Sequence, residues 1–395
     1  MYAPNPGAIV VAIEAGHGGC LDWGVPDPAR RGEAYAEKTI TLAVALALAE
    51  RLEASGVTTV LVRDGDEALA GDDYPDLGCH GAPFRDVNGD GFVGFGGEEL
   101  PEGTRTRDEL QARIDLANLS AADVLLSLHV DSITDAAGNQ LPIARTETFY
   151  TDETPWGDAR SRPLAEALQL HVVAAMASVA GYEREDRGTD ARNLYIVAPP
   201  LLEETPERPD RLKQPTRGAL MPAVLVEIGT ITLSAEHELL LTPEGAAAAA
   251  SGLFEGLADF FGARELSGRI ALADPSPRRP AAVDGVGPPF WPPAAPDGQV
   301  RLRLTNTGTA RWPEGMALVA GWEASEEPYL AFPPAARSTV VADVPSLEPG
   351  ASVVIEVTLP PAPPARGVAW ISLEHEGETL ADHGSPALQL DSGAP

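Results

Sequence analysis

The sequence is short of basic residues and of long apolar runs. Its 395 residues carry 28 Lys+Arg against 59 Asp+Glu, a formal net charge of −31, and Lys38 and Lys213 are the only lysines. So acidic a chain is a poor partner for nucleic acid or for an anionic membrane surface. No apolar run is long enough to span a membrane. The 44% hydrophobic content is ample for a packed core, and the length exceeds that of one typical domain.

Other familiar signals are missing as well. No charged and then hydrophobic leader precedes the first apolar segment, so we expect no secretory signal within this chain. No Gly-x-Ser-x-Gly turn occurs and neither cysteine lies in a catalytic signature, which argues against serine or cysteine catalysis. The two cysteines, Cys20 and Cys79, either form a disulfide, which would suit an exported protein, or remain two free thiols.

Two apolar segments of the sequence each end on a histidine. The run 8–13 leads into a glycine-rich turn that holds His17, and the run 125–128 ends on His129. If both runs are strands of one sheet, the two imidazoles meet at one edge. Glu37 opens a long predicted helix, where the helix dipole favours a carboxylate. Two imidazoles and a carboxylate with an open fourth position make a catalytic zinc site, although an isolated strand-end histidine or helix-start glutamate is also common.

A fourth segment carries an acid inside an apolar strand. The run 222–229 is apolar except for Glu227 near its carboxyl end. Burial raises the pKa of a carboxyl group, and a neighbouring metal-activated water would give it a proton to take and return, so Glu227 is the candidate general acid/base. The alternative is a structural glutamate that caps a loop or pairs with Arg187 or Arg192.

In this order and spacing, the segments resemble the zinc-dependent N-acetylmuramoyl-L-alanine amidases of the Amidase_3 type, over about residues 8–262. The motifs that carry the resemblance are Gly16-His17-Gly18-Gly19, Glu37-Lys38, Val60-Leu61-Val62-Arg63, Arg113 with Ala117-Asn118, Ser127-Leu128-His129 and Val226-Glu227-Ile228-Gly229. The resemblance implies that His17, Glu37 and His129 bind Zn²⁺ and that Glu227 is catalytic. It also implies hydrolysis of the amide between N-acetylmuramic acid and L-alanine in peptidoglycan.

The sequence departs from the family pattern near the expected site. Asp131 stands where asparagine is frequent, and Gly229-Thr230-Ile231 replaces the usual Gly-Phe. These departures affect the expected substrate contacts, for which Asp131 and Arg192 are the candidates. Two alternative functions stay open: a zinc peptidase acting on another amide, and a non-catalytic wall-binding protein on an amidase scaffold. We expect a monomer that acts outside the cell or in the cell wall after loss of a leader, or a phage lysis protein made in the host cytoplasm.

Strand and helix signals alternate through the first part of the chain. They predict an α/β fold over residues 1–264, with a mixed, mainly parallel sheet flanked by helices at about 37–54, 104–119, 163–179 and 243–261. An acidic, glycine-rich insertion occupies about 68–103. Within it, Asp86, Asn88 and Asp90 match the first half of an EF-hand-type loop, which predicts either Ca²⁺ binding or a plain acidic turn, since Gly97 stands at the twelfth position.

The composition changes after Gly262. Proline-rich sequence at 265–297 predicts an extended linker. Short β-rich runs separated by Pro and Gly follow over 298–395 and predict a second, smaller all-β sandwich. The stretch 304–313 with Leu347-Glu348-Pro349-Gly350 resembles Ig-like modules of the NBR1-central type. Such a module would serve as a spacer or as a wall-binding unit, and a spacer is the favoured interpretation.

Overall fold

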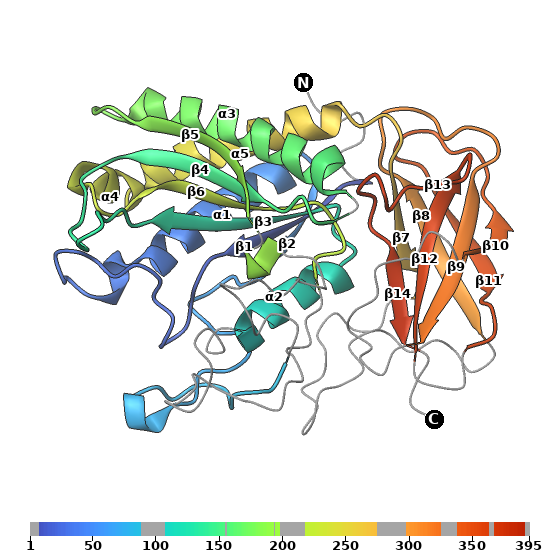
Figure 1. Cartoon of the computed structure of the whole chain (residues 1–395), viewed down its shortest axis with the longest axis horizontal. Helices are drawn as coiled ribbons and strands as arrows, with labels where there is room; N and C mark the ends of the chain where they lie inside the picture. Colours follow the sequence, from blue (N-terminus) through green and yellow to red (C-terminus); the bar gives the residue numbers. More distant parts are fainter. Residues whose placement is uncertain are drawn as a thin grey trace.

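The first part of the chain is built on one six-stranded sheet. The computed structural model describes residues 8–87, 107–154, 156–192, 194–197, 218–274, 298–324, 338–362 and 367–391. The strand order is β2-β1-β3-β6-β4-β5 (Figure 1). The strands are β1 Val10–Ala15, β2 Thr58–Leu61, β3 Val124–Asp131, β4 Arg145–Tyr150, β5 Glu185–Ala191 and β6 Ala223–Thr230. Strands β2, β1, β3 and β6 run parallel, whereas β4 and β5 run antiparallel to β6.

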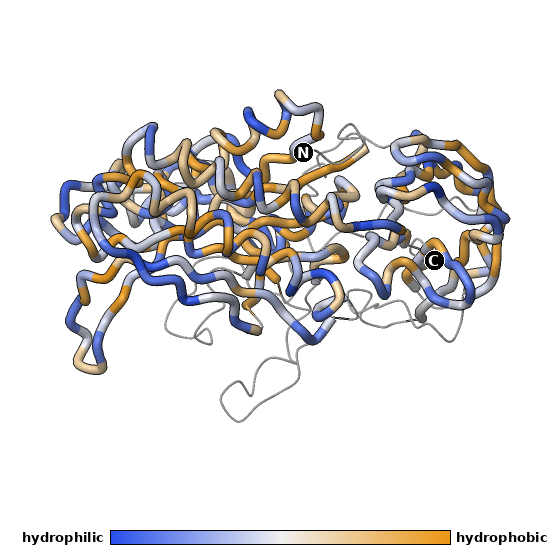
Figure 2. The backbone as a smooth tube through the Cα atoms, turned by 90° about the horizontal axis from the view of Figure 1, so that it is seen from above, coloured by the Kyte–Doolittle hydropathy of each residue, from blue (hydrophilic) through white to orange (hydrophobic). Residues whose placement is uncertain are grey.

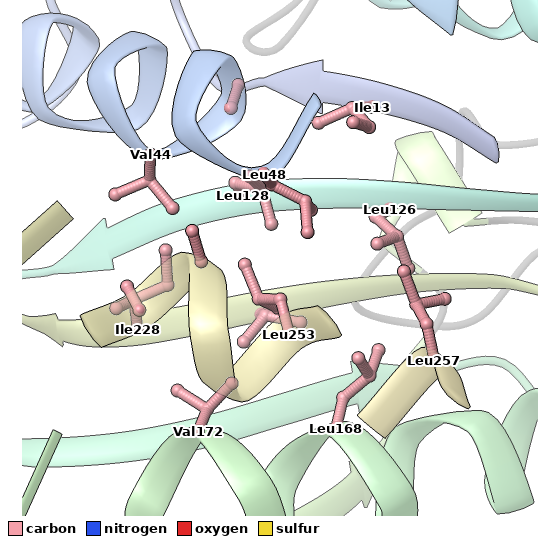
Figure 3. Close-up of a cluster of buried hydrophobic side chains, with 14 of the residues drawn as sticks. Ile13, Val44, Leu48, Leu126, Leu128, Leu168, Val172, Ile228, Leu253 and Leu257 are labelled. Atoms are coloured by element: carbon pink, nitrogen blue, oxygen red, sulfur yellow. The ribbon is translucent and has the colours of Figure 1, made fainter. Parts of the chain in front are cut away.

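Helices cover both faces of this sheet. They are α1 Glu37–Ala54, α2 Arg107–Leu119, α3 Arg162–Val179, α4 Ser234–Leu240 and α5 Pro243–Gly262. The largest apolar core joins α1, α3 and α5 to one face, where Leu48, Val172 and Leu253 meet Leu128 and Ile228 (Figure 3). A smaller core lies on the other face under α2, which Figure 1 shows across the sheet from α3 and α5.

Helix α1 has the sequence of a helix with one buried face. It is rich in alanine, with Glu37 in its first turn and Arg51 in its last, charges that suit the two ends of the helix dipole. Its buried Ile40, Val44, Leu48 and Leu52 recur every four residues and therefore share one face.

Helix α5 packs unusually close to α3. Thr242 caps its start by accepting a hydrogen bond from the Gly245 amide (3.0 Å), and Pro243 occupies the first turn, as predicted. A Cβ at Gly252 would lie 2.7 Å from the Val172 Cα, and one at Gly256 would lie 2.8 Å from the Leu168 Cα. The two helices can approach this closely because both positions are glycine.

The second part consists of antiparallel sheets around a separate core. The strands are β7 Gly268–Leu272, β8 Gln299–Asn306, β9 Ala317–Ala324, β10 Thr339–Asp343, β11 Ser352–Thr358, β12 Gly367–His375, β13 Glu378–Thr379 and β14 Leu388–Asp391. One sheet has the order β10-β9-β12-β13, with β14 also on β12, and the other has the order β11-β8-β7. Leu302 and Leu304 of one sheet and Leu318 and Ile371 of the other belong to one core, so the sheets pack face to face. Apolar segments run through the interior of both parts (Figure 2).

The second part contacts the edge of the first sheet where the parallel strands begin. Arg269 of β7 donates to the carbonyl oxygen of Ala8 (2.6 Å) and pairs with Asp123 (3.3 Å), and these two residues precede β1 and β3. Leu220, just before β6, packs on Val368. Arg160 donates to the carbonyl oxygen of His383. The second part therefore lies at the end of the sheet opposite the carboxyl ends of β1, β3 and β6.

The expected fold class, a mixed, mainly parallel sheet with helices plus a smaller all-β part, is confirmed. One segment differs from expectation. Strand β7 lies inside the range expected to be a linker, yet it pairs with β8, because its short apolar pattern buries Ile270 in the second core. The rest of that range, 275–297, lies outside the described residues. Among the described helices, none combines the length and the apolar character needed to cross a membrane.

Candidate active site

Three side chains from separate elements converge at the carboxyl ends of the parallel strands. His17 follows β1, His129 lies in β3, and Glu37 begins α1. The His17 Nε2 atom lies 3.2 Å from the Glu37 Oε2 atom, and the His129 Nδ1 atom lies 3.0 Å from the Glu37 Oε1 atom. Each of the three residues offers one ligand atom, and these three atoms all lie within 4.8 Å of one another.

This donor set fits a zinc ion. Two imidazoles and a carboxylate are typical zinc ligands, and donors about 2.0–2.1 Å from a tetrahedral centre are about 3.3 Å from one another. The separations of 3.2 Å from His17 to Oε2 and 3.0 Å from His129 to Oε1 of Glu37 are close to that value. The set is also well supported, because Asp22 Oδ1 accepts from His17 Nδ1 at 2.6 Å and leaves Nε2 directed at Glu37.

Glycines allow the cluster to close. A Cβ at Gly16 would lie 2.5 Å from the His129 ring, and a Cβ at Gly24 would lie 2.4 Å from the Glu37 Oε2 atom. His17 itself has φ 63°, in the left-handed region that non-glycine residues rarely adopt. Such strained backbone is characteristic of sites whose geometry is fixed by the surrounding structure.

Two buried arginines fix the strained turn. Arg113 of α2 donates to the carbonyl oxygens of Ala15 (2.9 Å) and His17 (2.7 Å) and forms an ion pair with Glu14. Arg63 donates to the carbonyl oxygens of Ala15 (2.8 Å) and Gly16 (3.1 Å). The turn from Ala15 to His17 is thus held by hydrogen bonds from two charged side chains, which are stronger than neutral ones.

The charges of the cluster shift its pKa values in the metal-free state. Burial alone would lower the pKa of His17, but Glu37 and Asp22 outweigh burial and raise that pKa to about 10. Burial would raise the pKa of Glu37, but His17 and His129 hold that pKa below its usual range. Burial would likewise raise the pKa of Glu14, but Arg113 and His129 keep it lowered. The carboxylates are therefore ionised, as metal binding requires.

Glu227 lies next to this cluster on the central strand β6. Its Cα lies opposite that of His129 on β3 and opposite that of Glu147 on β4. The Oε2 atom is buried and has no hydrogen-bond partner within the described part of the chain. Burial, and next the charges of Glu37 and Asp131, raise the pKa of Glu227 well above its usual value. A carboxyl group whose pKa is raised accepts a proton more readily than an ordinary glutamate, as a general acid/base requires.

Comparison with known proteins identifies the family to which this chain belongs. A family model described as N-acetylmuramoyl-L-alanine amidase matches residues 11–259, well over half of the chain. The chain belongs to the Amidase_3 family. The match contains each of the three clustered side chains and Glu227.

Individual relatives of the Amidase_3 region are distant. A cell wall amidase of Bacillus anthracis is 28% identical over 163 residues, which cover 40% of this chain and 25% of that protein. The germination-specific N-acetylmuramoyl-L-alanine amidase of Bacillus subtilis is 22% identical over 257 residues, 64% of this chain and 79% of that protein. The CwlD amidase from Clostridioides difficile, solved in complex with the GerS lipoprotein, is 19% identical with a TM-score of 0.44, over 64% of this chain and 98% of that chain.

The two expected substrate-binding residues of this Amidase_3 chain lie apart. Asp131 ends β3 beside the site and forms an ion pair with Arg145. Arg192 follows β5, and its amide donates to the carbonyl oxygen of Tyr150, which lies opposite Val224 at the start of β6. Because β4 and β5 run antiparallel to β6, Arg192 lies at the far end of the sheet, where it pairs with Asp190 (2.8 Å). Neither it nor Arg187 is paired with Glu227.

The structure joins Cys20 and Cys79 in a disulfide, with Cα atoms 5.8 Å apart. This bond ties the insertion to the loop that carries His17. Of the three residues expected to bind calcium, Asp86 is described, whereas Asn88 and Asp90 lie outside the described residues.

Three contributors to the site escaped sequence reasoning. Glu14 accepts from Ser127 Oγ and from Arg113, and its Oε2 atom lies 3.9 Å from the His129 Nε2 atom. The sequence does carry a signal for Glu14, because this residue, like Glu227, is an acid within an apolar strand. Asp22 and Arg145 carried no comparable signal, since neither lies inside a long apolar run of the sequence.

Proposed function

We propose that this protein is a zinc-dependent N-acetylmuramoyl-L-alanine amidase that cleaves peptidoglycan between the lactyl group of N-acetylmuramic acid and L-alanine. The observation that carries the proposal is the convergence of His17, Glu37 and His129 beside a partly buried glutamate of raised pKa, within a chain of the Amidase_3 family. His17, Glu37 and His129 would hold the metal ion. The ion would act as a Lewis acid on the amide carbonyl and would acidify the attacking water.

Glu227 is assigned the proton transfers. It takes the proton of the attacking water as the new C–O bond forms, and it gives that proton to the leaving nitrogen as the C–N bond breaks. Support comes from its position opposite His129 and from its buried, unpartnered Oε2 atom among the described residues. The other side chains have positioning roles: Asp22 orients His17, and Arg113 holds the turn on which His17 lies.

The test combines metal content with product analysis on the full chain. Wild type, Glu227→Gln, His129→Ala and a control, Glu50→Gln on the exposed side of α1, are compared. We expect stoichiometric zinc in all but His129→Ala. Mass spectrometry of digested peptidoglycan should find free stem peptides with an L-alanine amino terminus for wild type and Glu50→Gln. The rate for Glu227→Gln should be lower by about 10²-fold to 10⁴-fold.

The opposite results are equally clear. A zinc-loaded wild type that leaves the lactyl amide intact would refute the substrate and leave either cleavage of another amide or wall binding without catalysis. An active Glu227→Gln would refute the assignment of the acid/base alone.

We also infer that the second part is an Ig-like spacer. Two observations support this inference. The second part is a sandwich of two antiparallel sheets. It contacts the first part at the far end of the catalytic sheet, through Arg269 and Val368 and through the bond from Arg160 to His383. In this division the catalytic unit spans about 1–264, and the spacer begins with the segment that leads into β7 rather than after a linker.

A further inference from the structure

An ion pair crosses the strand that carries Glu227. Strand β6 lies between β3 and β4 in the sheet. Asp131 at the end of β3 nevertheless contacts Arg145 at the start of β4, through Oδ2 and Nη2. The pair therefore bridges across β6 at its carboxyl end, next to Glu227.

The guanidinium of Arg145 is only partly used by this bridge. Nη2 binds Asp131 and lies 3.7 Å from the Glu147 Oε2 atom. Nε is buried without a partner, and no hydrogen bond engages Nη1 within the described residues. The side chain is 22% exposed. Because guanidinium groups hold their donors in a fixed plane, anchoring Nη2 leaves Nη1 directed and available, whereas Nε is buried.

The position of Arg145 in the sheet determines which part of a substrate it could meet. Going along the sheet, β1 and β3 bring His17 and His129, β6 brings Glu227, and β4 brings Arg145. On the proposed function, the carbonyl carbon lies at the metal-binding cluster and the leaving nitrogen lies on the side of Glu227, which protonates it. Arg145, one strand beyond Glu227, is thus on the side of the leaving peptide.

We propose that Arg145 is a specificity-determining residue that donates hydrogen bonds to an acceptor oxygen on the second residue of the leaving peptide. This inference rests on the proposed function. Asp131 is then a positioning residue: its Oδ1 atom accepts from the Ser132 amide (2.6 Å), and its Oδ2 atom holds the guanidinium over β6. The acceptor is either a carboxylate or a neutral carbonyl, and both are present in peptides linked through a side-chain carboxyl.

Three soluble substrates separate the possibilities. N-Acetylmuramoyl-L-alanine amide lacks the second residue, the D-isoglutamine derivative adds it with an α-carboxamide, and the D-isoglutamate derivative adds it with an α-carboxylate. In both longer substrates the γ-carboxyl group is blocked as its methylamide, so that they differ in the α-substituent alone. Each is tested with wild type, Arg145→Gln, Arg145→Lys and Arg192→Gln, the last being the same change at an exposed arginine at the far end of the sheet. We measure kcat and KM separately, together with zinc content and Tm.

For Arg145→Gln we expect a loss of about 10-fold to 100-fold in kcat/KM on the two longer substrates, the worth of a hydrogen bond to a charged group. The short substrate should change by less than about threefold, as should every substrate with Arg192→Gln. Arg145→Lys keeps the positive charge but loses the planar set of donors, so its loss of kcat/KM should lie between those of wild type and Arg145→Gln. A larger loss of kcat/KM on the isoglutamate substrate than on the isoglutamine substrate would identify the carboxylate as the acceptor of the Arg145 hydrogen bond. Equal losses on the two would identify the neutral oxygen as the acceptor.

A loss of equal size on all three substrates would overturn the inference, because it would mean that Arg145 only holds the sheet together. If Arg145→Gln unfolds, Arg145→Lys carries the same comparison. A zinc-loaded wild type that cleaves none of the three substrates would refute the proposed function and this inference with it. That outcome is read from the wild type alone and is therefore distinct from a failure of Arg145.

Discussion

The Cys20–Cys79 disulfide should stabilise the protein without shaping the candidate site. The two cysteines are 59 residues apart in sequence. A cross-link that closes a loop of this length reduces the chain entropy of the unfolded state by an amount worth about 4 kcal/mol at 25 °C. Replacing both cysteines with alanine should therefore lower the free energy of unfolding by about that much, and lower the Tm by about 10 °C.

The candidate site should survive this change. Cys20 is only three residues from His17, but His17 is held by Arg113, through its carbonyl oxygen, and by Asp22, through Nδ1. The insertion is anchored independently, since Glu109 accepts from the amides of residues 69 and 70 (3.0 and 2.7 Å). Zinc content and the rate of peptide release at 25 °C should thus equal those of the wild type.

Urea denaturation followed by circular dichroism gives the free energy of unfolding for both proteins, and metal analysis and peptide release are measured on the same samples. Wild type treated with a reductant should match the double alanine variant, which itself should not respond to the reductant. A loss below about 1 kcal/mol would refute the entropy argument. Loss of zinc in the variant would instead show that the disulfide holds the His17 loop in place.

Three further changes test other parts of the structure. Gly252→Ala should destabilise the protein by about 1–3 kcal/mol in urea denaturation, although alanine favours helices, because the new Cβ would clash with α3; equal or higher stability would contradict the close packing. Hydrogen bonds from Arg31 lower the pKa of buried Asp27, so its stabilisation is present above pH 4 and lost as the pH falls further; Asp27→Asn should be less stable than wild type at pH 7, with a difference that shrinks on acidification, and a constant difference would refute this. Arg269→Ala removes a partner of Asp123 and should cost about 1–3 kcal/mol without changing peptide release, whereas a lower rate would mean that the second part acts on the site.

The sequence predicted those parts of the site that depend on local patterns. His17 and His129 end apolar runs, and Glu37 starts a helix with a regular buried face, so their elements could be assigned from periodicity alone. Once β1 and β3 are parallel neighbours, their carboxyl ends must share an edge of the sheet.

Residues whose placement depends on strand direction could not be predicted. Arg192 is a candidate substrate contact in the sequence, and the alternative role of Glu227 was an ion pair with it or with Arg187. Strands β4 and β5 run the other way, so the end of β5 lies far from Glu227, whereas the start of β4 brings Arg145 close to it. No local pattern encodes this reversal, since it follows from how the strands pair across the sheet. The same holds for β7, whose five residues pair with a strand beyond a proline-rich segment.

The positions of the two parts bear on how the protein would meet its substrate. The candidate site lies at the carboxyl ends of β1, β3 and β6, whereas Arg269 and Val368 contact residues that precede those strands. The second part could close over the site only by breaking these buried contacts. The net charge of −31 offers no long-range attraction to an anionic wall. On the proposed function, substrate selection falls to short-range groups at the site edge, among them Arg145, which Asp131 holds there.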